Sequence, residues 1–66
     1  MHERLKELRI ERGLRLKDVA NQLNVTIRTI SRYEDGTREP SVEFIIKFCK
    51  LYEVSADYLL GLVDGY

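Results

Sequence analysis

Two arginines stand one helical turn apart in the stretch VTIRTISRYEDG, residues 25–36. If this stretch is helical, Arg28 and Arg32 project from one face, because residues i and i+4 are neighbours on a helix surface. A planar guanidinium can donate two parallel hydrogen bonds to O6 and N7 of guanine in the major groove of DNA, a match worth about 1–3 kcal/mol in discrimination. Small polar residues around the arginines would allow a close approach to a base edge. The alternative is an ordinary solvated helix face.

Other kinds of chemistry find little support in the residues. The sequence has one histidine, His2, and one cysteine, Cys49. It therefore offers no serine–histidine–acid set, no paired-carboxylate site, no Gly-rich phosphate loop and no Cys/His cluster for a structural metal. We predict a protein that is not an enzyme and uses no cofactor or metal ion, with no small-molecule ligand evident. Cys49 lies in the apolar run FIIKFC and is expected to be a small buried hydrophobe.

Charge is balanced overall but not along the chain. The 11 basic and 11 acidic residues give a net charge of zero, which by itself argues weakly against a nucleic-acid partner. Residues 1–38 hold nine Lys or Arg against six Asp or Glu, and residues 39–66 hold two against five. Between Arg12 and Arg32, only Asp18 opposes five basic residues. One half of the domain could therefore face phosphates while the other half faces something else.

The elements that must position these residues are helices, because no segment shows the sustained alternation of a strand. We predict helices over residues 3–12, 14–23, 27–34, 42–53 and 56–61. Gly13, Asn24 and the turn at Asp35–Gly36 would end the first three. Thr26, Ser41 and Ser55 are good N-caps for the last three. With links of two to six residues, residues 1–66 form one compact all-α, five-helix domain.

A chain of 66 residues makes only a small core. It buries about 60% of the surface that its unfolded form exposes, and no disulfide can support it. A second subunit could complete the core. The charged stretch MHERLKELR is not a secretory signal, no run approaches the roughly 18 apolar residues of a membrane span, and a lone thiol suits a reducing compartment. We expect a cytoplasmic protein without membrane association.

The second and third predicted helices are joined by only about three residues, Asn24 to Thr26. So short a link forces a sharp crossing, and Ala20 is the small residue where the two helices would touch. The apolar packing of the pair would come from Leu16, Val19, Leu23, Val25, Ile30 and Tyr33. This is the helix-turn-helix pattern, here over residues 16–35, in which the second helix lies in the major groove.

The stretch LKDVANQLNVTIRTISRYEDGTREPS resembles the helix-turn-helix of the Xre/Cro/C1-repressor family of bacterial and phage transcriptional regulators. The resemblance runs from RLKELR through SADYLLG. Its most specific part is the joint spacing of Ala20, Val25, Ile30, Glu34, Gly36 and Pro40. It implies a phage-repressor-like five-helix domain that binds a palindromic operator in double-stranded DNA as a dimer.

Carried over position by position, the resemblance gives roles to residues of this sequence. Ile27, Arg28 and Arg32 fall where the family reads base edges, with Ile27 against a thymine methyl. Thr26 would open the recognition helix beside the DNA backbone, and further backbone contacts are expected at Arg15, Lys17, Thr29, Ser31, Thr37 and Arg38. Arg9 and Glu34 occupy positions that pair in the family between the first helix and the end of the third, as a scaffold contact.

Two positions depart from the family's pattern. The second helix usually opens with Thr-Gln or Ser-Gln, which cap the helix and bind phosphate, whereas Arg15 and Leu16 stand here. We expect the cap to be lost, although Asp18 in the first turn suits the helix dipole. Arg15 and Lys17 are expected to take over the electrostatic role. The second departure is Asn24, where glycine is usual.

The fourth predicted helix is apolar on two faces, which are Val42, Ile45, Ile46 and Cys49, and Phe44, Phe48 and Leu51. A helix that is apolar nearly all round is buried on all sides or serves an interface. Either the first and fifth helices cover it, or the protein is a symmetric homodimer, which we prefer. Its recognition helices would lie about 34 Å apart, one DNA turn. The expected interface is Phe44, Phe48, Leu51, Tyr58, Leu62, Val63 and Tyr66.

These features predict a sequence-specific DNA-binding transcriptional regulator, in the first place a repressor. An alternative with the same fold is an antitoxin or a restriction-modification controller, which binds operators but answers to a partner protein or its own concentration. A rival of another class is a protein-interaction module that no longer binds DNA. The zero net charge and the absent glutamine at Leu16 favour that rival slightly.

Overall fold

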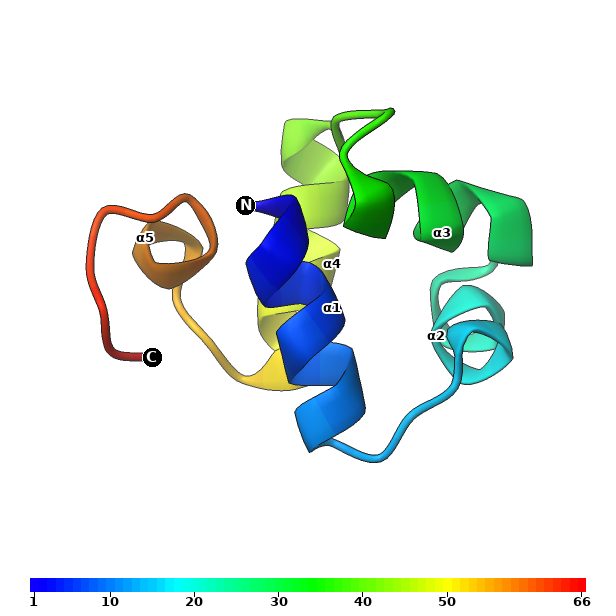
Figure 1. The fold of residues 1–66 in the computed structure, drawn as a ribbon, viewed down its shortest axis with the longest axis horizontal. Helices are drawn as coiled ribbons and strands as arrows, with labels where there is room; N and C mark the ends of the chain where they lie inside the picture. The colour runs from blue at the N-terminus through cyan, green and yellow to red at the C-terminus, as the bar shows by residue number, and fades with distance from the viewer.

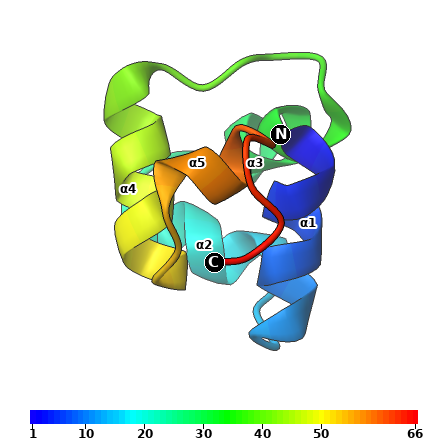
Figure 2. The same ribbon diagram turned by 90° about the vertical axis from the view of Figure 1, so that its left-hand side faces the viewer.

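The computed structural model describes all 66 residues and contains five helices and no strand (Figure 1). The helices are α1 (His2–Glu11), α2 (Leu16–Leu23), α3 (Ile27–Asp35), α4 (Val42–Tyr52) and α5 (Ala56–Leu59). The predicted all-α, five-helix architecture is confirmed. In Figure 2, α1 and α4 stand on opposite sides of the domain, with α5 in front and α2 and α3 behind. None of the five helices is long and apolar enough to cross a membrane.

Short-range hydrogen bonds explain where three of the helices begin. The hydroxyl oxygens of Thr26, Ser41 and Ser55 accept hydrogen bonds from backbone N–H groups three residues later, at 3.2, 3.3 and 3.1 Å. The C-terminal ends of α2 and α3 are also set by single residues, because Asn24 (φ 58°) and Gly36 (φ 82°) take the left-handed conformation that ends these helices. These caps are the expected ones, and they fix the loops on both sides of α3.

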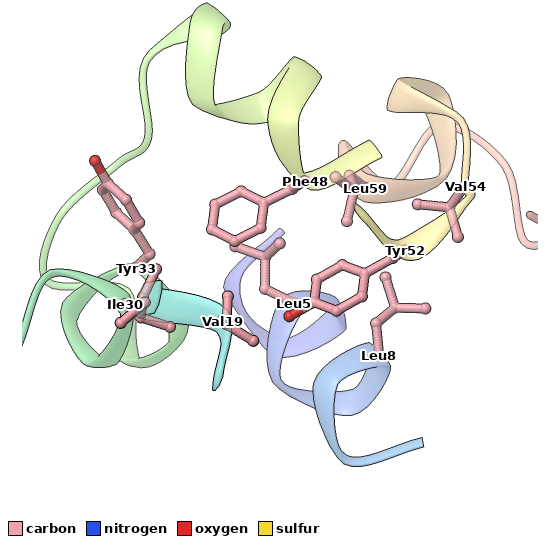
Figure 3. Packing of buried hydrophobic residues seen from close by; sticks show 10 residues of the cluster. Leu5, Leu8, Val19, Ile30, Tyr33, Phe48, Tyr52, Val54 and Leu59 are labelled. Atoms are coloured by element: carbon pink, nitrogen blue, oxygen red, sulfur yellow. The ribbon is translucent and has the colours of Figure 1, made fainter. Parts of the chain in front are cut away.

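The core draws on all five helices (Figure 3). Its buried apolar side chains are Leu5, Leu8, Val19, Ala20, Ile30, Tyr33, Phe48, Tyr52, Val54 and Leu59. The Phe48 ring stacks on Tyr52 at 6.1 Å between centroids and meets Tyr33 edge-on at 6.0 Å. Each such side chain contributes about 1.5–3 kcal/mol by leaving water, so the aromatic row carries much of the stability of a small domain.

The orientation of α4 corrects one expectation. Phe48 was expected at a dimer interface, but it is only 1% exposed and lies in the monomer's own core. Phe48 and Tyr52 are one turn apart, so α4 turns this face toward α1, while Val42 and Ile46 stay 73% and 49% exposed. Cys49 is half-buried, and desolvation raises the pKa of its thiol.

The segment after α5 folds back along α1 (Figure 2). The Arg4 guanidinium donates to the carbonyl oxygens of Tyr58 and, at 2.7 Å, Val63. The Tyr66 hydroxyl donates to the Glu11 carboxylate, at 2.5 and 2.6 Å from its two oxygens. These contacts hold the C-terminal residues against the first helix, on the side of the domain opposite α2 and α3 (Figure 1).

Candidate nucleic-acid interface

Helices α2 and α3 form a compact unit with a tight turn. The Val25 N–H donates to the Ala20 carbonyl at 2.9 Å, and Ala20 is 2% exposed, so a larger side chain would not fit there. Figure 1 shows α2 end-on where α3 is seen from the side, which means that the two axes cross steeply. The unit therefore presents the outer face of α3 to the solvent.

The outer face of α3 carries the three residues that were expected to read bases. Ile27, Arg28 and Arg32 are exposed, whereas Ile30 and Tyr33 on the opposite face are buried in the core. Neither arginine forms an ion pair or a side-chain hydrogen bond within the chain. Both guanidinium groups therefore keep their donors for an external acceptor.

The basic residues divide into those that have a carboxylate partner and those that do not. Ion pairs occupy Arg4, Arg9, Arg12, Arg15 and Lys47. The basic residues without one are Lys6, Lys17, Arg28, Arg32, Arg38 and Lys50. Four of these six lie in α2, in α3 or in the loop after α3. The uncompensated positive charge of a protein with zero net charge is therefore gathered on the helix-turn-helix.

Two threonines form a hydroxyl pair at the start of α3. The Thr26 oxygen accepts from the Thr29 N–H at 3.2 Å and lies 3.0 Å from the Thr29 hydroxyl oxygen. One hydroxyl proton lies between the two oxygens, which leaves one proton of the pair to donate outward. The pair could therefore donate one hydrogen bond to a phosphate.

Thr37 and Arg38, the two candidate residues in the loop after α3, have different surroundings. The Thr37 N–H and hydroxyl both donate to Oδ1 of Asp35, at 2.9 and 2.6 Å, and these bonds lower the pKa of the Asp35 carboxyl. Both Thr37 donors are therefore used within the chain, and a phosphate contact at this residue stays a prediction. The Arg38 guanidinium lies 5.6 Å from the Tyr33 ring centroid, without a carboxylate partner.

The start of α2 is capped, contrary to the expectation that its cap is lost. Oδ2 of Asp18 accepts from the Arg15 backbone N–H at 2.7 Å, and the Arg15 side chain donates to the same carboxylate at 3.2 and 3.3 Å. These bonds lower the pKa of the Asp18 carboxyl. An acidic residue three positions after the N-cap was the available signal. Because Asp18 offsets the charge of Arg15, Lys17 is the stronger candidate for a phosphate contact.

Arg9 and Glu34 are paired, as expected. Nε of Arg9 donates to both carboxylate oxygens of Glu34, at 2.8 and 3.1 Å, and Nη1 donates to the Leu14 carbonyl at 3.0 Å. Glu34 is buried. The pair joins α1 to the last turn of α3 and so fixes how the recognition helix sits on the domain.

A shallow groove of about 160 Å³ lies between α1, α2 and α3. Its lining residues are Lys6, Arg9, Leu16, Ser31, Glu34 and Asp35. Ser31 thus faces this groove rather than the outermost part of α3. No group of three or more His, Cys, Asp or Glu side chains is placed to hold a metal ion.

Sequence comparison assigns the class of protein. A family model described as helix-turn-helix matches residues 5–59, which include all of the unit described above. The chain belongs to the Xre/Cro/C1 family of helix-turn-helix proteins. The family's helix-turn-helix is the DNA-binding unit of transcriptional regulators, which is the class of protein that the sequence predicted.

Curated relatives have names that agree with this family. The chain is 42% identical over 59 residues to the HTH-type transcriptional regulator ImmR of Bacillus subtilis, covering 89% of this chain and 46% of that protein. It is 41% identical over 64 residues to the HTH-type transcriptional regulator DdrOP3 of Deinococcus deserti, covering 97% and 50%. It is 39% identical over 51 residues to the cryptic phage CTXphi transcriptional repressor RstR of Vibrio cholerae, covering 77% and 46%. The chain thus spans about half the length of these relatives.

Proposed function

We propose that this domain binds a palindromic operator as a homodimer and represses transcription. The observation that carries the proposal is the gathering of unpaired basic side chains on the helix-turn-helix, at Lys17, Arg28, Arg32 and Arg38. Neutralising phosphates with such side chains releases counterions and supplies most of the sequence-independent affinity for DNA. A protein acting on chromosomal DNA in a bacterium would be cytoplasmic.

Base reading would come from the outer face of α3. Arg28 and Arg32 keep all their donors free, which suits bidentate bonds to guanine, and the exposed Ile27 could contact a thymine methyl. Positioning on the backbone would come from Lys17, Arg38 and the one outward hydroxyl proton of the Thr26–Thr29 pair. Arg15 could add a weaker contact, because Asp18 already offsets its charge.

The proposed dimer surface combines the C-terminal residues with side chains of α4 and α5, and Phe48 is removed from it. Leu62, Val63 and Tyr66 are exposed, and Phe44, Leu51 and Tyr58 are half-buried. An apolar surface of this kind favours a self-complementary contact between two copies. Two α3 helices related by such a contact would need to lie about 34 Å apart to enter successive major grooves on one side of the DNA.

Repression is the proposed sign of regulation because the printed name of one relative, RstR, is that of a transcriptional repressor. An antitoxin or a restriction-modification controller would use the same DNA-binding surface. A protein-interaction module would not need unpaired cations on α3, and these favour DNA binding over that rival.

The test is selection of binding sites from a randomised duplex library, followed by fluorescence anisotropy on the best site at several salt concentrations. We expect a sequence with two-fold symmetry. The logarithm of the affinity should fall with the logarithm of the salt concentration, with a slope of about −0.9 for each phosphate neutralised. A library that yields no enriched sequence, together with a slope near zero, would exclude the proposed function.

A further inference from the structure

Lys6 is an exposed cation that the sequence analysis did not select. It lies in α1, outside the helix-turn-helix, and has no carboxylate partner. It lines the groove between α1, α2 and α3, together with Leu16 and Ser31. The question is whether Lys6 is only solvated or has a ligand there.

The other charged groups of the groove already have partners. Glu34 accepts from Nε of Arg9 with both oxygens, at 2.8 and 3.1 Å. Asp35 accepts two hydrogen bonds from Thr37, at 2.9 and 2.6 Å. Asp35 has no cationic partner, but it accepts hydrogen bonds from Thr37, so Lys6 is the one charged group of the groove with neither an ion pair nor a side-chain hydrogen bond in the chain.

The α3 wall of the groove borders the base-reading side chains. Ser31 lies three residues after Arg28, and Asp35 lies three residues after Arg32, and residues at this spacing are neighbours on a helix surface. When a recognition helix enters the major groove, the side chains beside its reading face lie toward the sugar–phosphate backbone. A long, flexible lysine from α1 is suited to bind a phosphate there as a point charge.

We propose that Lys6 extends the DNA-binding surface onto α1 by binding a backbone phosphate at the mouth of this groove. The proposal rests on the DNA-binding function proposed above. It gives the site four free cations from the helix-turn-helix and a fifth from a helix that packs against it. The contact would be with phosphate alone, so Lys6 would add affinity without preference for sequence.

The experiment compares the parent with Lys6→Ala, Lys6→Arg and the control Lys50→Ala. Lys50 is also exposed and unpaired, but it lies in the last turn of α4, away from the end of α4 where Phe44 meets Tyr33. The probes are a mixed-sequence duplex of about 30 base pairs and the best selected site, each titrated between about 50 and 200 mM KCl. Thermal melts check that all four proteins fold.

We expect Lys6→Ala to weaken binding to both duplexes by the same factor and to make the salt slope shallower by about 0.9 per bound subunit. Over that salt range, its deficit against the parent should shrink about threefold per subunit. Lys6→Arg and Lys50→Ala should keep the parent's slope. A Lys6→Ala slope equal to that of Lys50→Ala, or a loss confined to one sequence, would overturn the proposal while leaving the proposed function intact. A parent that binds neither duplex would overturn both.

Discussion

Nε of Arg9 lies 2.8 Å from Oε2 of Glu34, and the two side chains are only 13% and 6% exposed. The pair links the last turn of α1 to the last turn of α3, the helix that carries the two arginines proposed to read bases. Mutual attraction offsets the desolvation of the two charges only while both are present. The position of α3 on the domain therefore depends on this buried ion pair.

Removing one partner of this pair should be costly. We expect Glu34→Ala to lower the free energy of unfolding by about 3–5 kcal/mol, because it leaves the Arg9 charge buried and unpaired. Urea denaturation followed by circular dichroism gives the value. Glu39→Ala is the matched control, since Glu39 is exposed and has no basic partner. Equal stability of the two variants would show that the pair contributes nothing.

Removal of the Tyr52 hydroxyl should raise the stability of the domain. This oxygen is buried without a hydrogen-bond partner, and desolvation raises the pKa of the phenol. An unsatisfied buried polar group costs about 1–3 kcal/mol, so Tyr52→Phe should stabilise the domain by up to that amount while keeping the ring stacked on Phe48. Tyr52→Leu, which loses the stack, should destabilise it. A lower melting temperature for Tyr52→Phe would contradict this view of the core.

Substitutions of the two α3 arginines should change sequence preference, whereas substitution of Lys17 in α2 should change only the overall affinity for DNA. We expect Arg28→Ala and Arg32→Ala each to lose about 1–3 kcal/mol on the best site and to relax preference at one position of each half-site. Lys17→Ala should weaken all sequences about equally. Library selection with each variant measures this. All three side chains are exposed, so melting temperatures should not change. Arginine variants with the parent's full preference would show that α3 is only a solvated face.

Stability should fall in acid because folding lowers the pKa of two carboxyl groups. The pKa of Asp18 is lowered by bonds from Arg15, and that of Asp35 by bonds from Thr37. A lowered folded-state pKa means that the contribution is fully present above the ordinary value of about 3.8 and is lost as pH falls below it. We expect Asp18→Asn with Asp35→Asn to flatten the melting temperature profile below about pH 4. An unchanged profile would place the acid sensitivity elsewhere.

The sequence was sufficient where structure is decided locally. Caps at Thr26, Ser41 and Ser55 and the left-handed Asn24 follow from residue type and spacing. Two helix ends were less accurate, because α2 begins at Leu16 rather than at residue 14 and α5 ends at Leu59 rather than at residue 61. Ile30 is buried, and Arg28 and Arg32 lie on the opposite side of the same helix. Helical periodicity alone therefore predicts that both arginines are exposed.

The failures have a different origin. Both faces of α4 are apolar, so periodicity could not decide whether the face with Phe48 or the face with Val42 and Ile46 is buried. Packing of Phe48 in the core, edge-on to Tyr33 of α3, decided it. The N–H and hydroxyl of Thr37 donate to Asp35 two residues earlier, an Asx-turn that the spacing of Asp35 and Thr37 could have indicated. Lys6 was missed because its surroundings come from three helices that are separate in sequence.

The unequal pairing of charges has a consequence for how the protein meets DNA. The free cations lie mainly at the α2–α3 end, where Asp35 and Glu39 offset them only in part, and the second half of the chain adds the unpaired acids Glu53 and Asp57. From this uneven distribution we expect the domain to have an electric dipole although its net charge is zero. DNA, a polyanion, attracts a dipole without net charge only weakly at long range, but its field orients the dipole at short range. The domain should therefore arrive with α3 already oriented toward the duplex and spend little time bound in the reverse orientation.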